Sequence, residues 1–484
     1  IVFKALGIVS DKDIVRFITE TEETSIYTKW IQPSLRFAHA ININTQEQAI
    51  RYIACLKSGF KEPTENDYAF VQSIIDKDIL PHLLKDQLRK CYYIGFMVKR
   101  TIDCHLGILE FNDRDHYSNK RVDLAGHLLL KIFRGKFIGL INKLTSASVK
   151  ALNNEGEYTN AAKDISGADL TSVFESSLAT GKFKTNYYDT STNDGEAVCQ
   201  QYSYLSYIAR VAHTRRLQSP SSKAISTVTK PKQLHESQCA FTCLNESPEG
   251  HDVGMVKNFA LTCTVSLYTP DYSIVALIKK ISTFDSYNVQ MINDIPIDSS
   301  VNLANKVRIY NNADLLAFCD SQDIERVYDD LVICKRHCVI SPYCSIELNP
   351  YERSLIIHSD GGRFIRPVLI VEDNEVLLYK RIREDPAFAK RFFNDEITFD
   401  DLLMSSVKLS DKDLCTKTNG AYIEFIDPLQ SEFCMIGLRE KDIIEAKNQQ
   451  DSRKEQQMYK KYTHCEIHPI VMQGLVSSII PFSD

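Results

Sequence analysis

Apolar residues recur at helical spacing over about the first hundred residues of the chain. In "NDYAFVQSIIDKDILPHLL", Phe70, Ile74, Ile75 and Ile79 follow the near-helical spacing of an amphipathic helix. From Arg121 the pattern strengthens, because "RVDLAGHLLLKIFRGKFIGLINKL" repeats large apolar residues every three or four positions. These patterns predict a helical N-terminal region followed by one long helix. The polar run "TNYYDTSTNDGEA" at residues 185–197 then predicts a loop.

Farther along the chain the hydrophobic period changes from helical to two. In "NFALTCTVSLY", apolar residues from Phe259 to Leu267 alternate with small or polar ones, which predicts a strand buried on one face. The runs "VRIYN", "SIELNP", "SLIIHS" and "RPVLIVEDNEVLLY" also favour strands, so residues 258–380 are predicted to be mostly β. Helical segments return around "DPAFAKRFFN" and "FDDLLMSSV". The expected fold class is a multidomain α+β protein.

Length and composition add a domain count and a compartment. At about 150 residues per domain, 484 residues suggest roughly three domains. The best candidate for a membrane helix, "LLLKIFRGKFIGLI", is interrupted by three basic residues, so no membrane span is expected. Fourteen scattered cysteines and no signal peptide favour a reducing, intracellular compartment. The chain starts at Ile1 inside an apolar segment and stops at Asp484, so we expect a fragment of a longer protein.

A basic run is the most unusual local composition in this chain of net charge −6. The stretch "RVAHTRRLQSPSSKAISTVTKPK", residues 210–232, contains no Asp or Glu, and an acidic stretch follows it. Cationic residues in a loop rich in Ser and Thr suit contacts to phosphates. A solvated surface loop is an equally good interpretation of charge alone. The candidate phosphate-binding residues are Arg215, Arg216, Lys223, Lys230 and Lys232.

A turn is predicted directly after this run. In Ser247-Pro248-Glu249-Gly250, Pro at the second position and Gly at the fourth favour a type I or II turn. Glu249 would then lie at the tip of the turn, opposite in sign to the basic run.

Other clusters of reactive residue types carry weaker signals. The segment "CKRHCVISPYC" departs from the usual zinc spacings, so Cys334, Cys338 and Cys344 are interpreted as buried or incidental cysteines. His464 and His468 in "YTHCEIHP" are interpreted as satisfied structural groups. The alternating charges of "NDRDHYSNKR" are expected to pair with one another. We assign no metal site to any of these segments.

Several stretches together resemble one family, the second-largest subunit of multisubunit DNA-directed RNA polymerases of the eukaryotic, archaeal and large-DNA-virus type. The motifs occur in the family's order along nearly the whole chain. They are "FKALGIVSDKDI", "DRDHYSNKRVDLAG", "LATGKF", "AHTRR", "KPKQLHES" with "NESPEGHDVGMVKN", "DGGRFIRPVLIVED" and "YTHCEIHPIVMQGLVSSIIPFSD".

The resemblance implies a middle section of that subunit with six consecutive parts. A helical lobe and protrusion part would precede a mixed fork and mostly β external domains. The implied boundaries are 1–106 for the C-terminal part of the lobe, 107–190 for part of the protrusion, 191–270 for the fork, 271–375 for external 1, 376–462 for external 2 and 463–484 for the start of the hybrid-binding region.

The resemblance also implies a role in template-directed RNA synthesis. The chain would position the RNA–DNA hybrid, the downstream DNA and the nucleotide, with Glu249 supporting catalysis in the charged network around the nucleotide. Lys232 stands where many relatives carry Arg, which puts a bidentate contact in doubt. Mg²⁺ would be held mainly by the largest subunit, and this chain alone would hold none and would not be catalytic.

The implied partners are the largest and the smaller polymerase subunits, the DNA template, the RNA–DNA hybrid and nucleoside triphosphates, without a membrane. The implied location is the nucleus or, for a viral protein, the virion or host cytoplasm. Two alternatives stay open: a stand-alone nucleic-acid-binding module derived from that subunit, without catalysis, and a zinc-dependent scaffold built around the Cys334 cluster.

Overall fold

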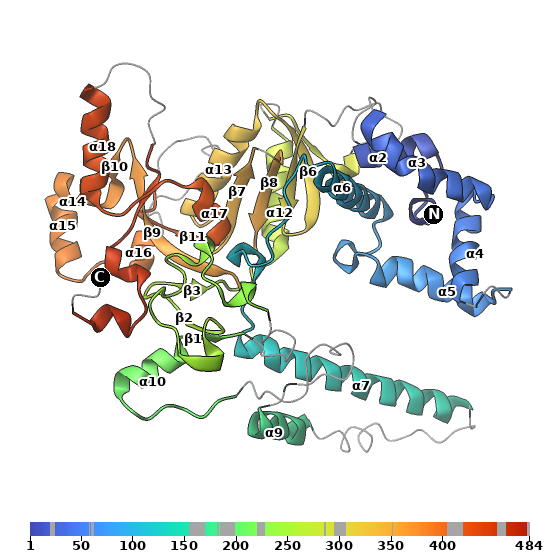
Figure 1. The fold of residues 1–484 in the computed structure, drawn as a ribbon, viewed down its shortest axis with the longest axis horizontal. Coiled ribbons are helices and arrows are strands. Elements are labelled where there is room, and N and C mark those ends of the chain that lie inside the picture. The colour runs from blue at the N-terminus through green and yellow to red at the C-terminus, as the bar shows by residue number, and fades with distance from the viewer. Residues whose placement is uncertain are drawn as a thin grey trace. The chain divides into compact units, whose positions relative to one another are not determined.

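The computed structural model shows two compact units, each assembled from three separate stretches of chain (Figure 1). The first unit comprises Ile1–Asp113, Thr269–Asp360 and Asp395–Tyr422, and the second comprises Arg114–Tyr268, Gly361–Asn394 and Ile423–Asp484. The structure describes residues 1–19, 25–57, 59, 62–153, 170–181, 183, 199–219, 228–284, 287–294, 306–350, 352–403, 420–452 and 461–481. The predicted loop at 185–197 lies outside these residues, and the division into six parts stays a prediction.

The N-terminal part of the first unit is helical, which confirms the prediction from apolar spacing. Its helices begin where side chains can cap them: Asp86 Oδ1 accepts a hydrogen bond from Arg89 N at 3.2 Å at the start of α6. Ile14, Phe17, Ile18, Ile75 and Cys91 are among the buried residues of its core. The elements are α1 (Val2–Ala5), α2 (Asp11–Thr19), α3 (Ser25–Ala40), α4 (Gln46–Lys57), α5 (Glu65–Ser73), a π-helix (Ile74–Asp78), a 3₁₀ turn (Pro81–Leu83) and α6 (Gln87–His105).

The rest of the first unit is a five-stranded sheet with helices packed on it. The strand order is β4-β6-β5-β8-β7, and only the pair β5 and β8 is parallel. Helix α12 contacts β4 and β6 and α13 contacts β7, and both helices share one apolar core with the sheet. The elements are α12 (Asp271–Ser282), β4 (Val289–Met291), a 3₁₀ turn (Ile292–Asp294), β5 (Lys306–Asn311), β6 (Asp314–Asp320), α13 (Ile324–Arg336), β7 (Ser345–Asn349), β8 (Ser354–His358) and α16 (Phe399–Leu403).

The mostly β prediction for residues 258–380 is therefore correct for the strands and wrong for two helices. Ile274, Ile278 and Ile281 of α12 have helical spacing and are all buried. A short apolar run fits both the helical period and the strand period of two, so the strands on either side favoured a β prediction for these helices as well. The end of "RPVLIVEDNEVLLY" was also misassigned, because helix α14 begins at Leu377.

The second unit is organised around β9, whose residues Phe364 to Val371 are all buried. Strands β10, β11, β13 and β3 all pair with β9, and β12 extends the sheet by pairing with β13. Its other regular elements are α7 (Ala125–Asn153), α9 (Leu170–Thr180), α10 (Tyr207–Thr214), α14 (Leu377–Glu384), α15 (Pro386–Phe393), α17 (Pro428–Phe433) and α18 (Glu440–Ser452). The strands are β1 (Arg216–Gln218), β2 (Val256–Asn258), β3 (Thr264–Val265), β9 (Phe364–Glu372), β10 (Glu375–Val376), β11 (Ile423–Ile426), β12 (Ile436–Gly437) and β13 (His464–Cys465).

The single strand predicted from "NFALTCTVSLY" is not formed. Strand β2 ends at Asn258 and β3 covers only Thr264–Val265, and between them Cys263 N donates to Ala260 O at 3.1 Å to close a turn. Leu267 is exposed. The alternation in the sequence could not reveal the turn, because residues distant in sequence hold it in place.

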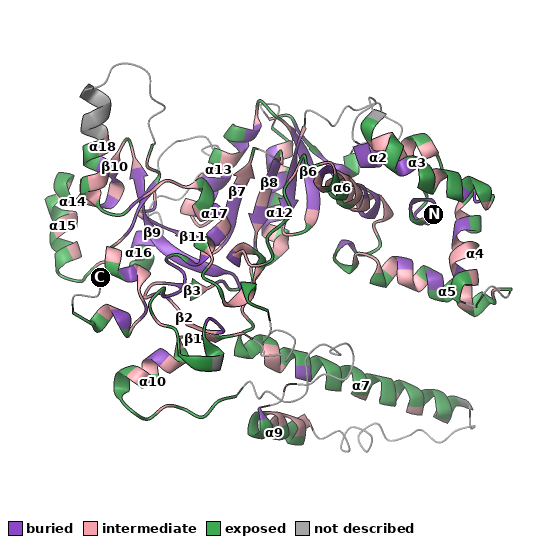
Figure 2. Ribbon diagram, viewed as in Figure 1, coloured by how far each residue is buried: buried purple, intermediate pink, exposed green. Residues whose placement is uncertain are grey.

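Helix α7 confirms the long helix predicted from residue 121 onward. Nearly all of its described residues are exposed or half-buried, with Ile132 as a buried exception (Figure 2). Among the described helices, none has the length and apolar content needed to cross a bilayer.

Candidate nucleic-acid interface

A short two-stranded ribbon in the second unit places Arg216 at the surface. Helix α10 begins with Ser206 as its cap and ends at Thr214, and β1 starts two residues later. Strand β1 pairs antiparallel with β2, so that Arg216 lies opposite Asn258. The Arg216 side chain is exposed. Its phosphate contact stays a prediction, but its position suits one.

The segment "KPK" forms a single 3₁₀ turn, Lys230–Lys232, with Pro231 as its second residue. Lys230 is exposed and Lys232 is half-buried. The backbone of Gly254 lies so close to this turn that a Cβ there would come within 2.0 Å of Lys232 O. Gly254 also has φ of +70°, which favours glycine. The basic turn therefore packs against the acidic segment that follows it in sequence. Lys223 lies outside the described residues.

Glu249 is exposed, as expected, but the turn predicted around it is absent. Its backbone is extended, with φ of −83° and ψ of 160°, and neither a type I nor a type II turn has this conformation at its third position. The chain instead turns immediately afterwards, through a 3₁₀ turn at Gly250–Asp252. Ser247 Oγ accepts a hydrogen bond from Gly254 N at 3.2 Å, which closes the loop around that turn. Gly250, with φ of +85°, provides the reversal that the sequence pattern assigned to the proline.

Arg215 is bound to the protein's own backbone. Its Nη2 donates to the carbonyl oxygens of Ala260, Leu261 and Cys263 at 2.7, 3.1 and 3.1 Å. Its Nε is shielded from solvent and has no hydrogen-bond acceptor among the described residues. Phosphate contact by Arg215 remains a prediction, and the structure shows what its guanidinium contacts within this chain.

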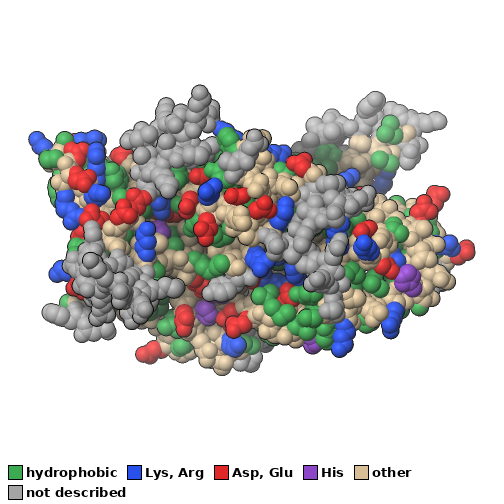
Figure 3. Space-filling model, turned by 90° about the horizontal axis from the view of Figure 1, so that it is seen from above, with side chains coloured by type: hydrophobic (Ala, Val, Ile, Leu, Met, Phe, Trp, Pro, Cys, Tyr) green, Lys and Arg blue, Asp and Glu red, His purple; other side chains and the backbone are tan. Residues whose placement is uncertain are grey.

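The charges of Arg216, Lys230 and Glu249 are not neutralised locally. Among the described residues, none forms an ion pair within 4.0 Å with these three side chains, whereas Lys120 pairs with Asp115 at 3.8 Å in the same unit. Figure 3 shows acidic and basic side chains interspersed on the face that it presents, without a large region of one sign.

A contact missed in the sequence joins the "DRDHYSNKR" motif to strand β2. Lys257 Nζ donates to Tyr117 Oη at 3.0 Å, and its ammonium lies 5.3 Å from the centre of the Tyr117 ring. Burial lowers the pKa of Lys257 to about 8, with the nearby Lys120 contributing in the same direction. Burial also raises the pKa of Tyr117, so the phenol stays protonated. Lys257 and Tyr117 lie 140 residues apart, so no local pattern in the sequence indicates this pair.

The prediction that the charges of that motif pair with one another is confirmed for Asp115 and Lys120. His116 Nε2 contacts the carboxylate of Glu432, in addition to the ion pair between Asp115 and Lys120. His464 is buried and lies 3.4 Å from Glu424 Oε2, and His468 Nδ1 accepts a hydrogen bond from Ile470 N at 3.1 Å. Both histidines are thus satisfied structural groups.

Two of the three cysteines of "CKRHCVISPYC", Cys334 and Cys344, belong to the first unit's core, and Cys338 is half-buried. Cys334 and Cys344 are fully buried, and burial raises the pKa of the Cys334 thiol to about 12. Across the described part of the chain, no group of three or more His, Cys, Asp or Glu side chains is placed to hold a metal ion. Whether these cysteines bind metal was left open by their spacing, and their packing among apolar residues favours a structural role.

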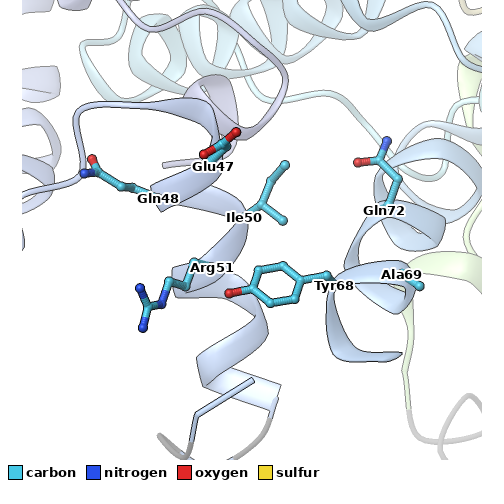
Figure 4. Close-up of a pocket in the computed structure, with 7 residues that line it drawn as sticks. All are labelled: Glu47, Gln48, Ile50, Arg51, Tyr68, Ala69 and Gln72. Atoms are coloured by element: carbon cyan, nitrogen blue, oxygen red, sulfur yellow. The ribbon is translucent and has the colours of Figure 1, made fainter. Parts of the chain in front are cut away.

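The first unit contains a groove between α4 and α5. It has a volume of about 650 Å³, and Figure 4 shows the Tyr68 ring of α5 pointing toward Arg51 of α4. None of the predicted binding residues lines it. Its mixed polar lining indicates no particular ligand.

Comparison with known proteins identifies the same family along the whole chain. The families described as RNA polymerase Rpb2, domain 2, domain 3, domain 4 and domain 5 match residues 1–123, 198–265, 309–372 and 412–469. The chain is 31% identical to DNA-directed RNA polymerase II subunit 2 of Arabidopsis thaliana, over 100% of this chain and 38% of the relative.

Two further relatives extend the similarity to other lineages. The chain is 28% identical to DNA-directed RNA polymerase II subunit RPB2 of Encephalitozoon cuniculi, over 100% of this chain and 39% of that protein. It is 24% identical to DNA-directed RNA polymerase subunit 2 of Acanthamoeba polyphaga mimivirus, over 99% of this chain and 40% of that protein. The chain spans about two fifths of the length of these relatives.

Proposed function

We propose, from the premise that this chain belongs to the family of second-largest subunits of DNA-directed RNA polymerase, that it supports template-directed RNA synthesis by positioning nucleic acid and nucleotide. One observation carries the proposal. Arg216, Lys230 and Glu249 are exposed, form no ion pair with any described residue and fall within the range that matches Rpb2 domain 3. Unneutralised charges at the surface are available to a charged ligand.

The two signs have different tasks in this proposal. Arg216 and Lys230 contact phosphates of the hybrid or the downstream DNA, with support from Lys232 and Lys223. Such contacts orient a nucleic acid without reading its bases. Glu249 places a negative charge beside the nucleotide, where it opposes misplaced phosphates and orients cations.

The chemistry of nucleotidyl transfer would come from elsewhere in the assembly. Two divalent ions, when bound, stabilise the attacking and leaving oxygens of such a transfer. As the family resemblance implies, we assign the ions mainly to the largest subunit and no catalytic step to this chain. Its partners are then the largest and smaller polymerase subunits, the template, the hybrid and nucleoside triphosphates.

The salt dependence of nucleic-acid binding tests the proposed phosphate contacts. The full subunit, assembled with its partner subunits, would carry Arg216→Ala or Lys230→Ala. The slope of log K against log salt concentration should become shallower by about 0.7 to 0.9 for each phosphate that the variant can no longer bind. Lys390→Ala removes an equally exposed cation from α15 and serves as the matched control, with an unchanged slope.

Glu249→Gln separates the nucleotide role from the phosphate contacts. It should change the KM for nucleoside triphosphates and leave the salt slope unchanged, because Gln keeps the shape and loses the charge. Unchanged slopes in both cation variants would contradict the proposal. Binding without RNA synthesis in the wild-type assembly would instead support a nucleic-acid-binding module without catalysis.

A further inference from the structure

We propose that Arg215 and Glu246 are positioning residues that hold Arg216 and Glu249 in fixed places, because Arg215 binds one and Glu246 the other of two backbone segments that are hydrogen-bonded to each other. The segments are the turn at residues 260–263 and the stretch at residues 473–478. This inference rests on the proposed function, because it concerns how the charged side chains named there are held.

The Arg215 side chain forms hydrogen bonds to three backbone carbonyl groups of the turn. One guanidinium nitrogen faces the oxygens of Ala260, Leu261 and Cys263, all within 3.1 Å. In addition, Phe259 N donates to Arg215 O at 2.9 Å, so backbone and side chain both join this residue to the turn. Three carbonyl oxygens directed at one point repel one another unless a cation lies between them. The Arg215 side chain therefore determines the shape of the turn.

The turn at residues 260–263 is hydrogen-bonded to residues 473–474, near the C-terminal end of the described chain. Leu261 N donates to Gln473 O at 2.8 Å, and Ala260 forms an isolated β-bridge with Gly474. A Cβ at Gly474 would come within 2.9 Å of the Cβ of Cys243. The approach is thus close on both sides of Gly474, and residues 473–478 cannot shift without moving the turn.

Glu246, in the acidic stretch that precedes Glu249, binds the segment at residues 473–478. Its Oε1 accepts a hydrogen bond from Ser477 N at 2.8 Å, at the start of the 3₁₀ turn Ser477–Ile479. Its Oε2 lies 2.8 Å from the position of a Cβ on Gly474. A carboxylate that accepts from a backbone N–H makes one of the stronger hydrogen bonds in proteins. Glu246 thereby anchors the acidic loop three residues before Glu249.

Arg215 and Glu246 lie close in sequence to the proposed contact residues Arg216 and Glu249. Arg215 precedes Arg216 on β1, and the loop bearing Glu249 is held by Glu246 before it and by the packing of Gly254 on Lys232 after it. The connection runs from Arg215 through the 260–263 turn and residues 473–478 to Glu246. Each link is a hydrogen bond or a close backbone contact.

Hydrogen exchange on the 484-residue chain tests the contacts of Arg215 and Glu246 with the backbone independently of any activity. Arg215→Ala should increase exchange at the Leu261 amide, and Glu246→Ala at the Ser477 amide, by roughly tenfold or more, because buried groups lose their partners. Arg215→Lys and Glu246→Gln keep a donor or an acceptor and should restore most of the protection. Arg216→Ala, the neighbouring exposed cation, is the control and should leave both amides protected. Unchanged exchange in the two alanine variants would overturn the proposal.

The assembled polymerase separates positioning from contact. Arg215→Ala should reduce the rate of nucleotide addition, because Arg216 is no longer held in place. When it is combined with Arg216→Ala, the salt slope of nucleic-acid binding should equal that of Arg216→Ala alone. A slope shallower than that by a further 0.7 or so, up to about 0.9, would show that Arg215 itself contacts a phosphate and would refute its positioning role. If the alanine variants fail to assemble, Arg215→Lys and Glu246→Gln give the same comparison. Failure of the proposed function is distinguishable, since it appears as unchanged slopes in Arg216→Ala and Lys230→Ala.

Discussion

The buried ion pair between Arg363 and Asp427 tests how strongly burial increases the loss of stability when one charge of a pair is removed. Arg363 Nη1 lies 3.2 Å from Asp427 Oδ2, and the two side chains are only 3% and 4% exposed. Asp427 also caps helix α17, since its Oδ1 accepts from Gln430 N at 2.8 Å. The substitution Asp427→Asn keeps a good capping residue and removes only the charge. The guanidinium then stays buried opposite a neutral group.

The expected cost is about 3–5 kcal/mol, the range for breaking a buried pair on one side. A surface pair with the same design provides the control. Asp385 caps α15 and pairs with Arg381 at 2.8 Å, but these side chains are 31% and 49% exposed. Asp385→Asn should therefore cost less than about 1 kcal/mol. Both substitutions keep a capping residue and remove one charge of an ion pair, but the first pair is buried and joins residues 64 positions apart, and the second is exposed and local.

Native-state hydrogen exchange suits this comparison, because a chain with two compact units need not unfold in one step. Amides of β11 and α17 should lose protection by roughly 100-fold or more in Asp427→Asn, and amides of α15 by less than about tenfold in Asp385→Asn. Adding Arg363→Met to Asp427→Asn should recover part of the loss, since no buried charge is then left without its partner. Equal losses in the two asparagine variants would refute the argument that burial sets the magnitude.

Three further predictions follow from single contacts. Gly254→Ala should disturb the "KPK" turn, because the new Cβ would meet Lys232 O and the left-handed backbone disfavours alanine; exchange at residues 229–233 should rise, whereas Gly250→Ala, with open space around it, should cost only about 1 kcal/mol. Lys257 has a pKa of about 8 in the folded chain and 10.5 as its usual value. Between these values the unfolded chain binds more protons, so urea stability should rise from about pH 7.5 to about pH 10 in the wild type, and Lys257→Met should remove that part of the rise. Leu331→Ala opens a cavity in the fully buried core of the first unit and should lower its stability by about 2–5 kcal/mol in urea unfolding; a loss below about 1 kcal/mol would contradict the packing.

The hydrophobic pattern was informative wherever one period ran uninterrupted. The helix at Ala125–Asn153 was predicted because its long apolar repeat fits only one kind of element. The strand at Phe364–Glu372 was predicted from Arg366 onward by a short run rich in Val, Leu and Ile. The pattern failed between Asn258 and Val265, where the apolar alternation is broken by a turn. There the carbonyl oxygens are held by the Arg215 side chain, and no local window of sequence contains that information.

The candidate site divides along the same line. The sequence alone determined that Arg216, Lys230 and Glu249 belong to one charged region and carry the motifs of the polymerase family, because residue type and order along the chain are sequence properties. Only the tertiary structure decided which charges stay at the surface and which serve the fold. Arg215 and Arg216 are adjacent and chemically identical, yet Arg215 follows the last residue of helix α10 and Arg216 begins strand β1. One guanidinium therefore faces three carbonyl oxygens in the protein, and the other faces solvent.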